Sequence, residues 1–297
     1  MKTIKYILYR LKWNLAPYFN FKNPVHLDLE LNNSCNQKCS MCWHSESTPF
    51  VIQSMKFPAA MNIIRSAAIN KIKSIKFNLR GEPLMYKHIN IIFSESRKLG
   101  FVDRMINTNG VLLNKGHFES GLNNCTVSLD ALDYENYKKI HNDSFQNFIK
   151  IIGNLKSARF YKHFSVEKIK VKLNVHINKH NIFDPILKHT EFSGFPVVKK
   201  YTKDRKGSNI SIDKKERTRK TMCPHLKRRL TVHVNGDVYP CCLSYDSPND
   251  IKLGNIYDST IKELWNGAKR KELIDNYKNG LYYDTCKNCT SNDIYKD

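Results

Sequence analysis

Hydrophobic runs of strand length alternate with longer segments of helical periodicity from residue 26 to residue 201. The short runs are rich in aliphatic and aromatic residues and predict strands, whereas apolar positions that recur every three or four residues predict helices. The predicted strands are His26–Asn32, Ser74–Leu79, Val102–Asn107, Thr126–Leu129, Lys168–Ile177 and Val197–Tyr201. The predicted helices between them are Pro58–Asn70, Ile89–Leu99, Tyr134–Arg159 and Ile182–His189.

Alternating strands and helices of this length predict an α/β fold with a parallel sheet that is either open or curled into a barrel. Functional side chains in such folds gather at the C-terminal ends of the strands. A lone histidine in a strand, such as His176, is nevertheless more often structural. Several of these ends carry candidate site residues, namely Gly81, Glu82 and Pro83, the turn Thr108–Gly110, Ser128 and Asp130, and Asn174 and His176.

The first twenty-two residues form a basic amphipathic segment. Arg10 and Lys12 interrupt the apolar core that a signal peptide would need. The pattern predicts a helix over residues 1–22 that either packs on the main domain or contacts a membrane surface. Its apolar positions fall at helical spacing with basic residues between them: Ile4, Ile7, Leu8, Leu11 and Leu15 alternate with Lys2, Lys5, Arg10 and Lys12.

Composition places the chain among folded proteins of a reducing compartment. Of its 297 residues, 41% are hydrophobic and 11% are aromatic, which is enough to build a core. Nine cysteines are too few for a secreted disulfide scaffold of this length, and their clustering favours metal binding. No run of about eighteen apolar residues occurs, so we expect no transmembrane helix and a cytoplasmic location.

The net charge of +22 leaves the partner open. A basic surface attracts nucleic acid, an anionic membrane or an acidic substrate, but a composition rich in lysine and asparagine gives the same charge without a dedicated partner. The most basic stretch, residues 199–220, predicts an interdomain linker or a segment that tracks an anionic substrate. We expect four units: residues 1–22, a main domain over 23–203, a basic linker over 204–222 and a small domain over 223–297.

Three cysteines lie close together after the first predicted strand. Cys35, Cys39 and Cys42 are spaced C-x3-C-x2-C, and three thiolates on one loop can hold three irons of a [4Fe–4S] cluster. The fourth iron then has no local protein ligand, and an open metal position is where a substrate or cosubstrate binds. A zinc site completed by His44 is the alternative, although C-x3-C is a looser fit to the cysteine pairs of zinc sites.

This spacing resembles the signature of the radical S-adenosylmethionine (SAM) superfamily. The resemblance implies a partial, TIM-like (β/α)6 barrel and a catalytic cluster, held by Cys35, Cys39 and Cys42, whose open iron binds SAM. It also implies reductive cleavage of SAM to a 5′-deoxyadenosyl radical, which abstracts hydrogen from a C–H bond of a substrate. An electron donor such as flavodoxin or ferredoxin is the implied redox partner.

The resemblance also assigns cofactor contacts. Glu82 matches the glutamate that contacts the SAM amino group, within a Gly81-Glu82-Pro83 motif. Arg80 stands where the family commonly has glycine, so this sequence departs from the family pattern at that position. The remaining implied contacts are Met41 near the adenine, Ser128 and Asp130 near the ribose and carboxylate, and Asn174 and His176 toward SAM or the substrate.

Five further cysteines lie in the last quarter of the chain, and four of them form a second candidate set. Cys223 and Cys241 flank a predicted hairpin, and Cys286 and Cys289 form a C-x2-C pair after the predicted helix Ser259–Tyr277. We expect the hairpin to bring Cys223 and Cys241 together. Four thiolates suit either a second [4Fe–4S] cluster or a structural zinc ion.

The spacing of this second set, C-x12-G-x4-C, resembles the auxiliary-cluster domain called SPASM. No cysteine follows Cys289, so the segment is similar to the shortened, one-cluster version called Twitch, which occurs in an aminocyclitol dehydrogenase of butirosin biosynthesis. The resemblance implies one auxiliary [4Fe–4S] cluster with four protein ligands that relays or accepts an electron. Cys242 is an alternative ligand to the adjacent Cys241.

Together these resemblances cover residues 24–290 and imply a radical SAM enzyme. The expected reaction is the oxidation or another modification of a sugar-like or aminocyclitol-like molecule or of a peptide. Radical modification of nucleic acid is an alternative, because the chain is strongly basic. A non-catalytic nucleic-acid-binding module with structural metal sites is an alternative of a different class.

Overall fold

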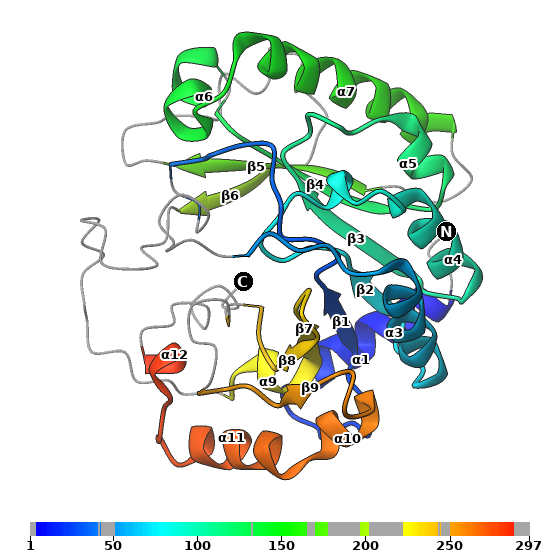
Figure 1. Ribbon diagram of the computed structural model, residues 1–297, viewed down its shortest axis with the longest axis vertical. Helices are drawn as coiled ribbons and strands as arrows, with labels where there is room; N and C mark the ends of the chain where they lie inside the picture. The colour runs from blue at the N-terminus through cyan, green and yellow to red at the C-terminus, as the bar shows by residue number, and fades with distance from the viewer. Residues whose placement is uncertain are drawn as a thin grey trace.

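The computed structural model describes residues 4–40, 42, 51–131, 133–164, 170–177, 197–201, 222–242, 244 and 250–287 of the chain. Within them, nine strands form one sheet in the order β6-β5-β4-β3-β2-β1-β7-β8-β9. The strands from β6 to β7 pair in parallel, and the pairs β7–β8 and β8–β9 are antiparallel. Figure 1 shows the sheet curving around an interior, as a partial barrel does.

All six strands predicted for the main domain are present, with ends that differ by a few residues. The pairing of β1 with β7 was not predicted, and it joins the C-terminal segment to the barrel sheet. The strands are β1 (His26–Leu29), β2 (Ser74–Lys76), β3 (Asp103–Thr108), β4 (Asn124–Asp130), β5 (Lys170–Ile177), β6 (Val197–Tyr201), β7 (Arg229–Val232), β8 (Asp237–Tyr239) and β9 (Gly254–Asn255).

Helices cover the outer face of the barrel sheet (Figure 1). The region Tyr134–Arg159 is mostly helical, as predicted, and contains two helices, because Asn142 adopts a left-handed conformation with φ 47° and ends the first of them. One short helix, α5, was not predicted. The helices of this layer are α3 (Phe57–Ile69), α4 (Ile89–Lys98), α5 (Lys115–Glu119), α6 (Tyr134–His141) and α7 (Phe145–Phe164), with a 3-10 turn, η1 (Pro83–Met85).

Strand β1 divides an apolar outer layer from a polar interior. Leu27 and Leu29 are fully buried in the core between sheet and helices, whereas Asp28 and His26 alternate with them and therefore point to the opposite face. Arg229 of β7 donates a 2.9 Å hydrogen bond to Asp28. Although burial alone would raise it, Arg229 and His26 hold the pKa of Asp28 well below its usual range. The inner face of the sheet is thus polar and charged.

The C-terminal segment extends this sheet and adds helices below it (Figure 1). Trp265 is fully buried, its indole N–H donates to the Phe21 carbonyl at 2.8 Å, and the Arg270 guanidinium stacks 3.3 Å from the centre of its ring. The predicted helix Ser259–Tyr277 is interrupted at Gly267. The helices of this segment are α9 (Pro224–Arg228), α10 (Ile261–Asn266), α11 (Ala268–Lys278) and α12 (Asp284–Lys287).

The predicted N-terminal helix is present as α1 (Ile4–Leu15), but it packs through a different face from the one its apolar pattern indicates. Tyr9 and Ala16 are buried against Val25, and Trp13 packs beside them. The aliphatic positions at helical spacing are exposed, namely Ile4, Ile7, Leu8, Leu11 and Leu15. Within the described part of the chain, no helix combines the length and apolar character needed to cross a bilayer.

Several predicted features lie outside the described residues. They are the helix Ile182–His189, most of the basic stretch 199–220, and three individual residues, Met41, His44 and Cys289. Strands β5 and β6 are described at the level of their backbone. The predicted limits of the four units along the chain stay a prediction.

Candidate functional site

The three clustered cysteines follow β1 at the C-terminal edge of the sheet. Cys35, Cys39 and Cys42 are all partly exposed, and a hydrogen bond of 3.0 Å from the Cys42 N–H to the Cys39 carbonyl closes a turn between two of them. Burial raises the pKa of Cys35 to about 11. Burial also raises the pKa of Cys39, and the nearby Cys42 and Cys35 raise it further because thiolates repel one another. The three thiols therefore lie within one local environment.

The turn after β2 is fixed directly against the start of this cysteine loop. A Cβ atom added to Gly81 would lie 2.5 Å from the Ser34 carbonyl oxygen, so the close approach of the two backbones requires glycine here. The Glu82 N–H donates to that same oxygen at 2.8 Å, and the Asn32 side chain donates to the Glu82 carbonyl at 3.2 Å. Pro83 follows as the buried first residue of η1.

The Glu82 carboxylate is buried and accepts three hydrogen bonds. The donors are the Leu84 N–H at 3.1 Å, the Thr108 hydroxyl at 2.7 Å and the Asn109 N–H at 2.8 Å. Burial raises the pKa of Glu82 to about 7, while these hydrogen bonds oppose the shift. The Asn109 side chain also donates to Asn36 at 2.7 Å, so the turn after β3 holds both Glu82 and the cysteine loop.

A histidine that the sequence did not single out contacts one of the cysteines. His141, the last residue of α6, places Nδ1 3.1 Å from Cys39 Sγ and Nε2 3.2 Å from Asp130 Oδ2. His141 and Asp130 are both buried, and the imidazole stacks on Tyr137 with ring centres 4.5 Å apart. A thiolate can only accept hydrogen bonds, so Nδ1 is the donor once Cys39 is deprotonated.

The last turn of α6 also holds the backbone of the cysteine loop. The Ser40 N–H donates to the Ile140 carbonyl at 2.8 Å. Earlier in the same loop, the Gln37 amide donates to the Tyr137 hydroxyl at 2.7 Å and to Asp143 at 2.6 Å. The loop is therefore fixed on one side by the turns after β2 and β3, and on the other by α6.

The residues predicted on β4 and β5 are only partly brought to this place. Asp130 adopts a left-handed conformation with φ 59° at the end of β4, where the pairing with β5 is shifted in register. Its side chain faces His141, a contact that was not expected when Asp130 was predicted to lie near the ribose and carboxylate of SAM. Ser128 is partly exposed, and its backbone pairs with that of Asn174, whereas His176 pairs with Lys200 of β6. Their predicted SAM contacts stay predictions.

Arg80, the departure from the family motif, forms an ion pair inside the sheet. Its guanidinium donates to both oxygens of Glu30, at 2.7 Å from Nε and 2.5 Å from a terminal nitrogen, and its backbone N–H donates at 3.1 Å. The same carboxylate accepts from the Val234 N–H of the C-terminal hairpin at 3.0 Å. Glu30 is fully buried, so this one side chain joins the β2 turn to the hairpin.

The second cysteine set borders the base of the hairpin. Cys223 and Tyr282 pack against one small apolar cluster, while Cys241 and Tyr283 pack against the neighbouring cluster. The Cys286 N–H donates to the Tyr283 carbonyl at 2.7 Å. Cys286 therefore lies beside Tyr283, which packs on the same cluster as Cys241, and the meeting of Cys223 with Cys241 stays a prediction.

Cys242, the alternative ligand, differs from Cys35 and Cys39 because its pKa is lowered rather than raised. A hydrogen bond with Cys241 and the nearby Arg229 together lower the pKa of Cys242 to about 6, whereas burial and Asp28 oppose the shift. Arg229 and Asp28 belong to the polar inner face of the sheet. Strand β7, which begins with Arg229, leads into the hairpin that precedes Cys241 and Cys242.

The donor set of the first loop fits an iron–sulfur cube. Each cysteine of such a cube binds a different iron, so its ligands are spread more widely than those of a single ion. Among the described residues, no three His, Cys, Asp or Glu side chains are grouped as ligands of one metal ion. Cys35, Cys39 and Cys42 nevertheless influence one another electrostatically, and a bound metal deprotonates such thiols.

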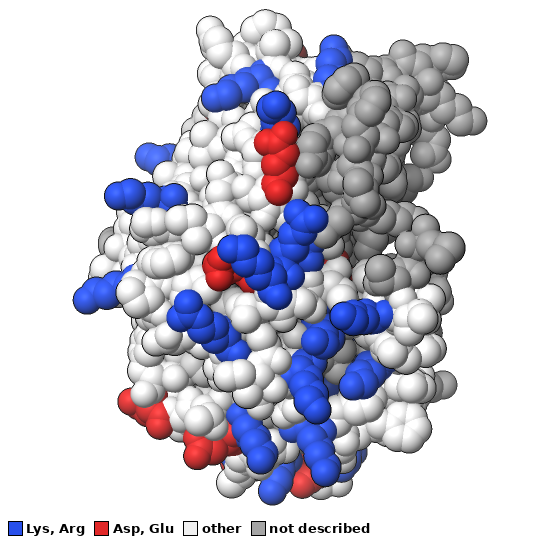
Figure 2. All heavy atoms as spheres, turned by 90° about the vertical axis from the view of Figure 1, so that its right-hand side faces the viewer, with Lys and Arg blue, Asp and Glu red and all other residues white. Residues whose placement is uncertain are grey.

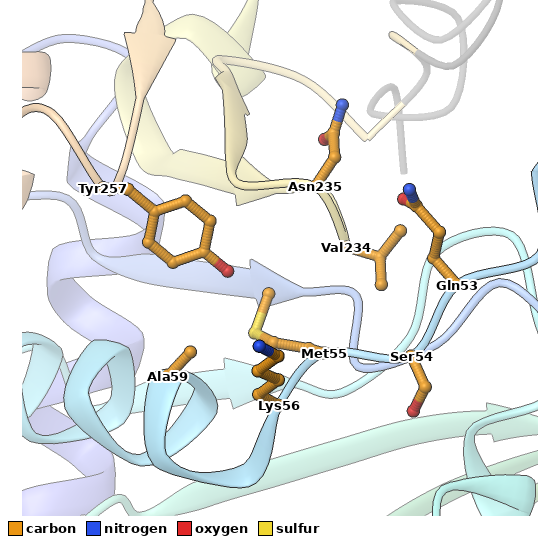
Figure 3. A pocket seen from close by; sticks show the side chains of 8 residues that line it. All are labelled: Gln53, Ser54, Met55, Lys56, Ala59, Val234, Asn235 and Tyr257. Carbon is orange, nitrogen blue, oxygen red and sulfur yellow. The ribbon is translucent and has the colours of Figure 1, made fainter.

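An open pocket of about 530 Å³ lies where the start of α3 meets the hairpin turn (Figure 3). No residue of the predicted site is among its described lining residues, and Lys56 and Tyr257 are the titratable groups that line it. The pocket therefore adds nothing to the cysteine site. Its lining residues are Gln53, Ser54, Met55, Lys56, Ala59, Val234, Asn235 and Tyr257.

Two family models match the chain. Residues 29–167 match the radical SAM superfamily, and residues 223–290 match SPASM, an iron–sulfur cluster-binding domain. The first match contains the cysteine loop and Glu82, and the second contains the later cysteine set. The chain is a radical SAM protein with a SPASM domain. These two domains imply a SAM-binding [4Fe–4S] cluster and auxiliary iron–sulfur binding.

Curated relatives match part of this radical SAM protein. A probable GTP 3′,8-cyclase of Saccharolobus islandicus is 28% identical over 167 residues, which cover 54% of this chain and 51% of that protein. A GTP 3′,8-cyclase of Clostridium perfringens is 27% identical over 176 residues, with coverage of 54% and 50%. The chain thus spans about half the length of the curated relatives that it matches.

Solved structures resemble nearly the whole radical SAM–SPASM chain. BtrN in complex with AdoMet and 2-DOIA has a TM-score of 0.59 at 20% identity, over 90% of this chain and 92% of that one. The enzyme anSMEcpe with bound AdoMet has a TM-score of 0.61 at 18% identity, with coverage of 90% and 83%. Streptococcus suis SuiB bound to precursor peptide SuiA has a TM-score of 0.59 at 15% identity, with coverage of 93% and 70%. The predicted partial barrel with a C-terminal auxiliary domain is therefore confirmed.

Two functional side chains were missed by sequence reasoning. Glu30 continues the alternation of His26 and Asp28 with leucines, and this period-two pattern could have indicated an inward-facing carboxylate. His141 has no such signal, because its contact with Cys39 joins residues that are far apart in the chain.

Proposed function

We propose that this radical SAM enzyme removes hydrogen from a C–H bond of its substrate as part of an oxidation. The observation that carries the proposal is that both cysteine sets border one polar interior. Arg229 begins β7, the strand that leads into the hairpin before Cys241, and it donates to Asp28 on the inner face of the sheet at 2.9 Å. Glu30 continues the same row and connects it to the turn that carries Glu82. A radical formed at the first site and an electron acceptor at the second would then face the same space.

The chain's own residues have distinct roles in this proposal. Cys35, Cys39 and Cys42 would hold the first cluster, which supplies the electron for SAM cleavage when it is bound. Glu82 offers a buried carboxylate to the SAM ammonium group, where an ion pair is strong because water is excluded. Gly81 allows the Glu82 turn to lie directly against the cysteine loop.

The auxiliary cysteines favour an oxidation. Cys223, Cys241, Cys286 and Cys289 would give one cluster four protein ligands, which leaves no iron open to a substrate. Such a cluster can only transfer electrons, and removal of an electron from a substrate radical completes an oxidation. The proposed substrates are a sugar-like or aminocyclitol-like molecule or a peptide, a range that fits the similar structures of BtrN in complex with 2-DOIA and of SuiB bound to a precursor peptide.

The test is formation of 5′-deoxyadenosine by the anaerobically reconstituted protein with SAM and a strong reductant. The reaction is run alone and with separate pools of sugars and aminocyclitols, peptides, nucleotides including GTP, and nucleic acids. A Cys35→Ala, Cys39→Ala, Cys42→Ala variant is the matched control, because it retains the auxiliary cysteines. No cleavage by protein that is shown to contain its iron would contradict the enzyme proposal.

Modification of nucleic acid is the second candidate, and the net charge of +22 favours it. Figure 2 shows a face on which Lys and Arg side chains are more widespread than Asp and Glu. If only the nucleic-acid pool stimulates SAM cleavage, and this stimulation weakens steeply as the salt concentration rises, then nucleic acid is the substrate class. Stimulation by small molecules or peptides alone would leave the charge without a role in catalysis.

A further inference from the structure

Helix α1 turns its aliphatic side chains away from the protein. Ile4 is 75% exposed, Leu8 is 55% exposed and Leu11 is 51% exposed, and Ile7 and Leu15 share this exposure. At 100° per residue these five positions fall within one face of the helix. A contiguous aliphatic face of this kind on a protein surface marks an interaction site.

The opposite face of α1 is fixed to the barrel, so the helix cannot roll over to bury its aliphatic residues. Tyr9 is buried, and the Trp13 ring lies 5.0 Å from the Arg228 guanidinium and 5.6 Å from the ring of His26. Arg228 also donates to the Trp13 carbonyl at 2.8 Å. Rotation of the helix would break these contacts, which anchor α1 to the starts of β1 and β7.

Basic residues border the aliphatic face on both sides. At helical spacing Lys5 and Lys12 fall on one flank and Arg10 on the other, all three are exposed, and α1 contains no acidic residue. Just beyond the helix, Tyr18 and Phe19 are also exposed. An aliphatic face with cationic flanks and nearby aromatic rings has the chemistry that binds the interface of a bilayer.

We propose that α1 docks this protein on an anionic membrane surface. The aliphatic face would enter the boundary between headgroups and acyl chains, while Lys5, Arg10 and Lys12 contact acidic lipid headgroups. A second copy of the chain is a poorer occupant, because a symmetric contact between two α1 helices would bring the same cationic flanks together. The proposal concerns location and is independent of the reaction catalysed at the cysteine site.

The test is flotation of the full-length, anaerobically purified protein with vesicles of phosphatidylcholine alone or of phosphatidylcholine with phosphatidylserine. We expect binding to the anionic vesicles that weakens with added salt. A Leu8→Ser, Leu11→Ser variant should bind at least about tenfold more weakly, because two half-exposed aliphatic contacts with lipid are lost. Ile69→Ser is the matched control, since Ile69 is 79% exposed on α3 and should leave binding unchanged.

Folding and self-association are followed in the same samples. Both variants alter exposed residues, so their thermal unfolding should match that of the parent protein. The proposal is overturned if the parent protein does not bind anionic vesicles. It is overturned as well if the Leu8→Ser, Leu11→Ser double variant binds them as well as the Ile69→Ser control does. It is also overturned if sedimentation shows a dimer that the Leu8→Ser, Leu11→Ser variant loses, while neither protein binds vesicles.

Discussion

Replacement of Arg80 by methionine is expected to lower the free energy of unfolding by about 3 kcal/mol. The Glu30 side chain is 0% exposed and that of Arg80 is 14% exposed, so their ion pair is largely shielded from water. Loss of one partner of a buried pair costs about 3–5 kcal/mol, because the remaining charge stays buried. Two backbone N–H groups, of Arg80 and Val234, still donate to Glu30, which favours the lower end of that range.

The assay is urea denaturation of the anaerobically reconstituted protein at neutral pH. Arg80→Lys is the control that retains the charge but loses the two-pronged geometry, and its loss should be smaller. A Glu30→Gln, Arg80→Met double variant should recover part of the stability, since no charge remains buried, so the two single losses should not add. A loss below about 1 kcal/mol for Arg80→Met, or strictly additive losses, would refute the assignment of a buried ion pair.

Three further predictions concern the first cysteine site. Gly81→Ala should reduce iron content and SAM affinity, because its Cβ would lie 2.5 Å from the Ser34 carbonyl oxygen; a variant that retains both would show that the two backbones can separate. His141→Ala should make the midpoint potential of the first cluster more negative in an EPR-monitored titration, because the hydrogen bond to Cys39 is lost, and His141→Gln should restore part of it. Burial raises the pKa of Glu82 to about 7, so SAM affinity, measured by calorimetry, should rise between about pH 6 and pH 8 and stay flat in Glu82→Gln. The same shift means that the stability contributed by Glu82 is complete below pH 4.5 and is lost as the pH rises through about 7.

The alternation of strands and helices was readable from the sequence, but the contacts between distant segments were not. Each barrel strand is a local hydrophobic run, so its period identifies it. The parallel pairing of β1 with β7 joins residues about two hundred positions apart, and no local pattern reports such a pairing. The break between α6 and α7 depends on the left-handed conformation of Asn142, which asparagine tolerates but does not require.

The candidate site, too, was predictable where short motifs specify it and unpredictable where distant segments meet. Cysteine spacing and the Gly81-Glu82 turn were predicted because short motifs specify them, whereas the contact between His141 and Cys39 arises only when α6 packs on the loop. Helix α1 shows a further limit of pattern reasoning. Its aliphatic periodicity predicted a helix that packs on the main domain or contacts a membrane, and it is Tyr9 and Trp13 that pack, with the Trp13 ring on the cationic groups at the start of β7.

Strand β1 connects the two cysteine regions mechanically. The loop with Cys35 begins at its C-terminal end, and β7, which leads into the auxiliary hairpin, pairs along its length. Glu30 then ties the β2 turn to the hairpin through Arg80 and Val234. A displacement of the hairpin must therefore either carry the Glu82 turn with it or break these hydrogen bonds. Substitutions in the auxiliary domain should consequently alter SAM affinity without touching SAM, an effect that Arg80→Met would weaken but not abolish, because the Arg80 and Val234 N–H groups still donate to Glu30.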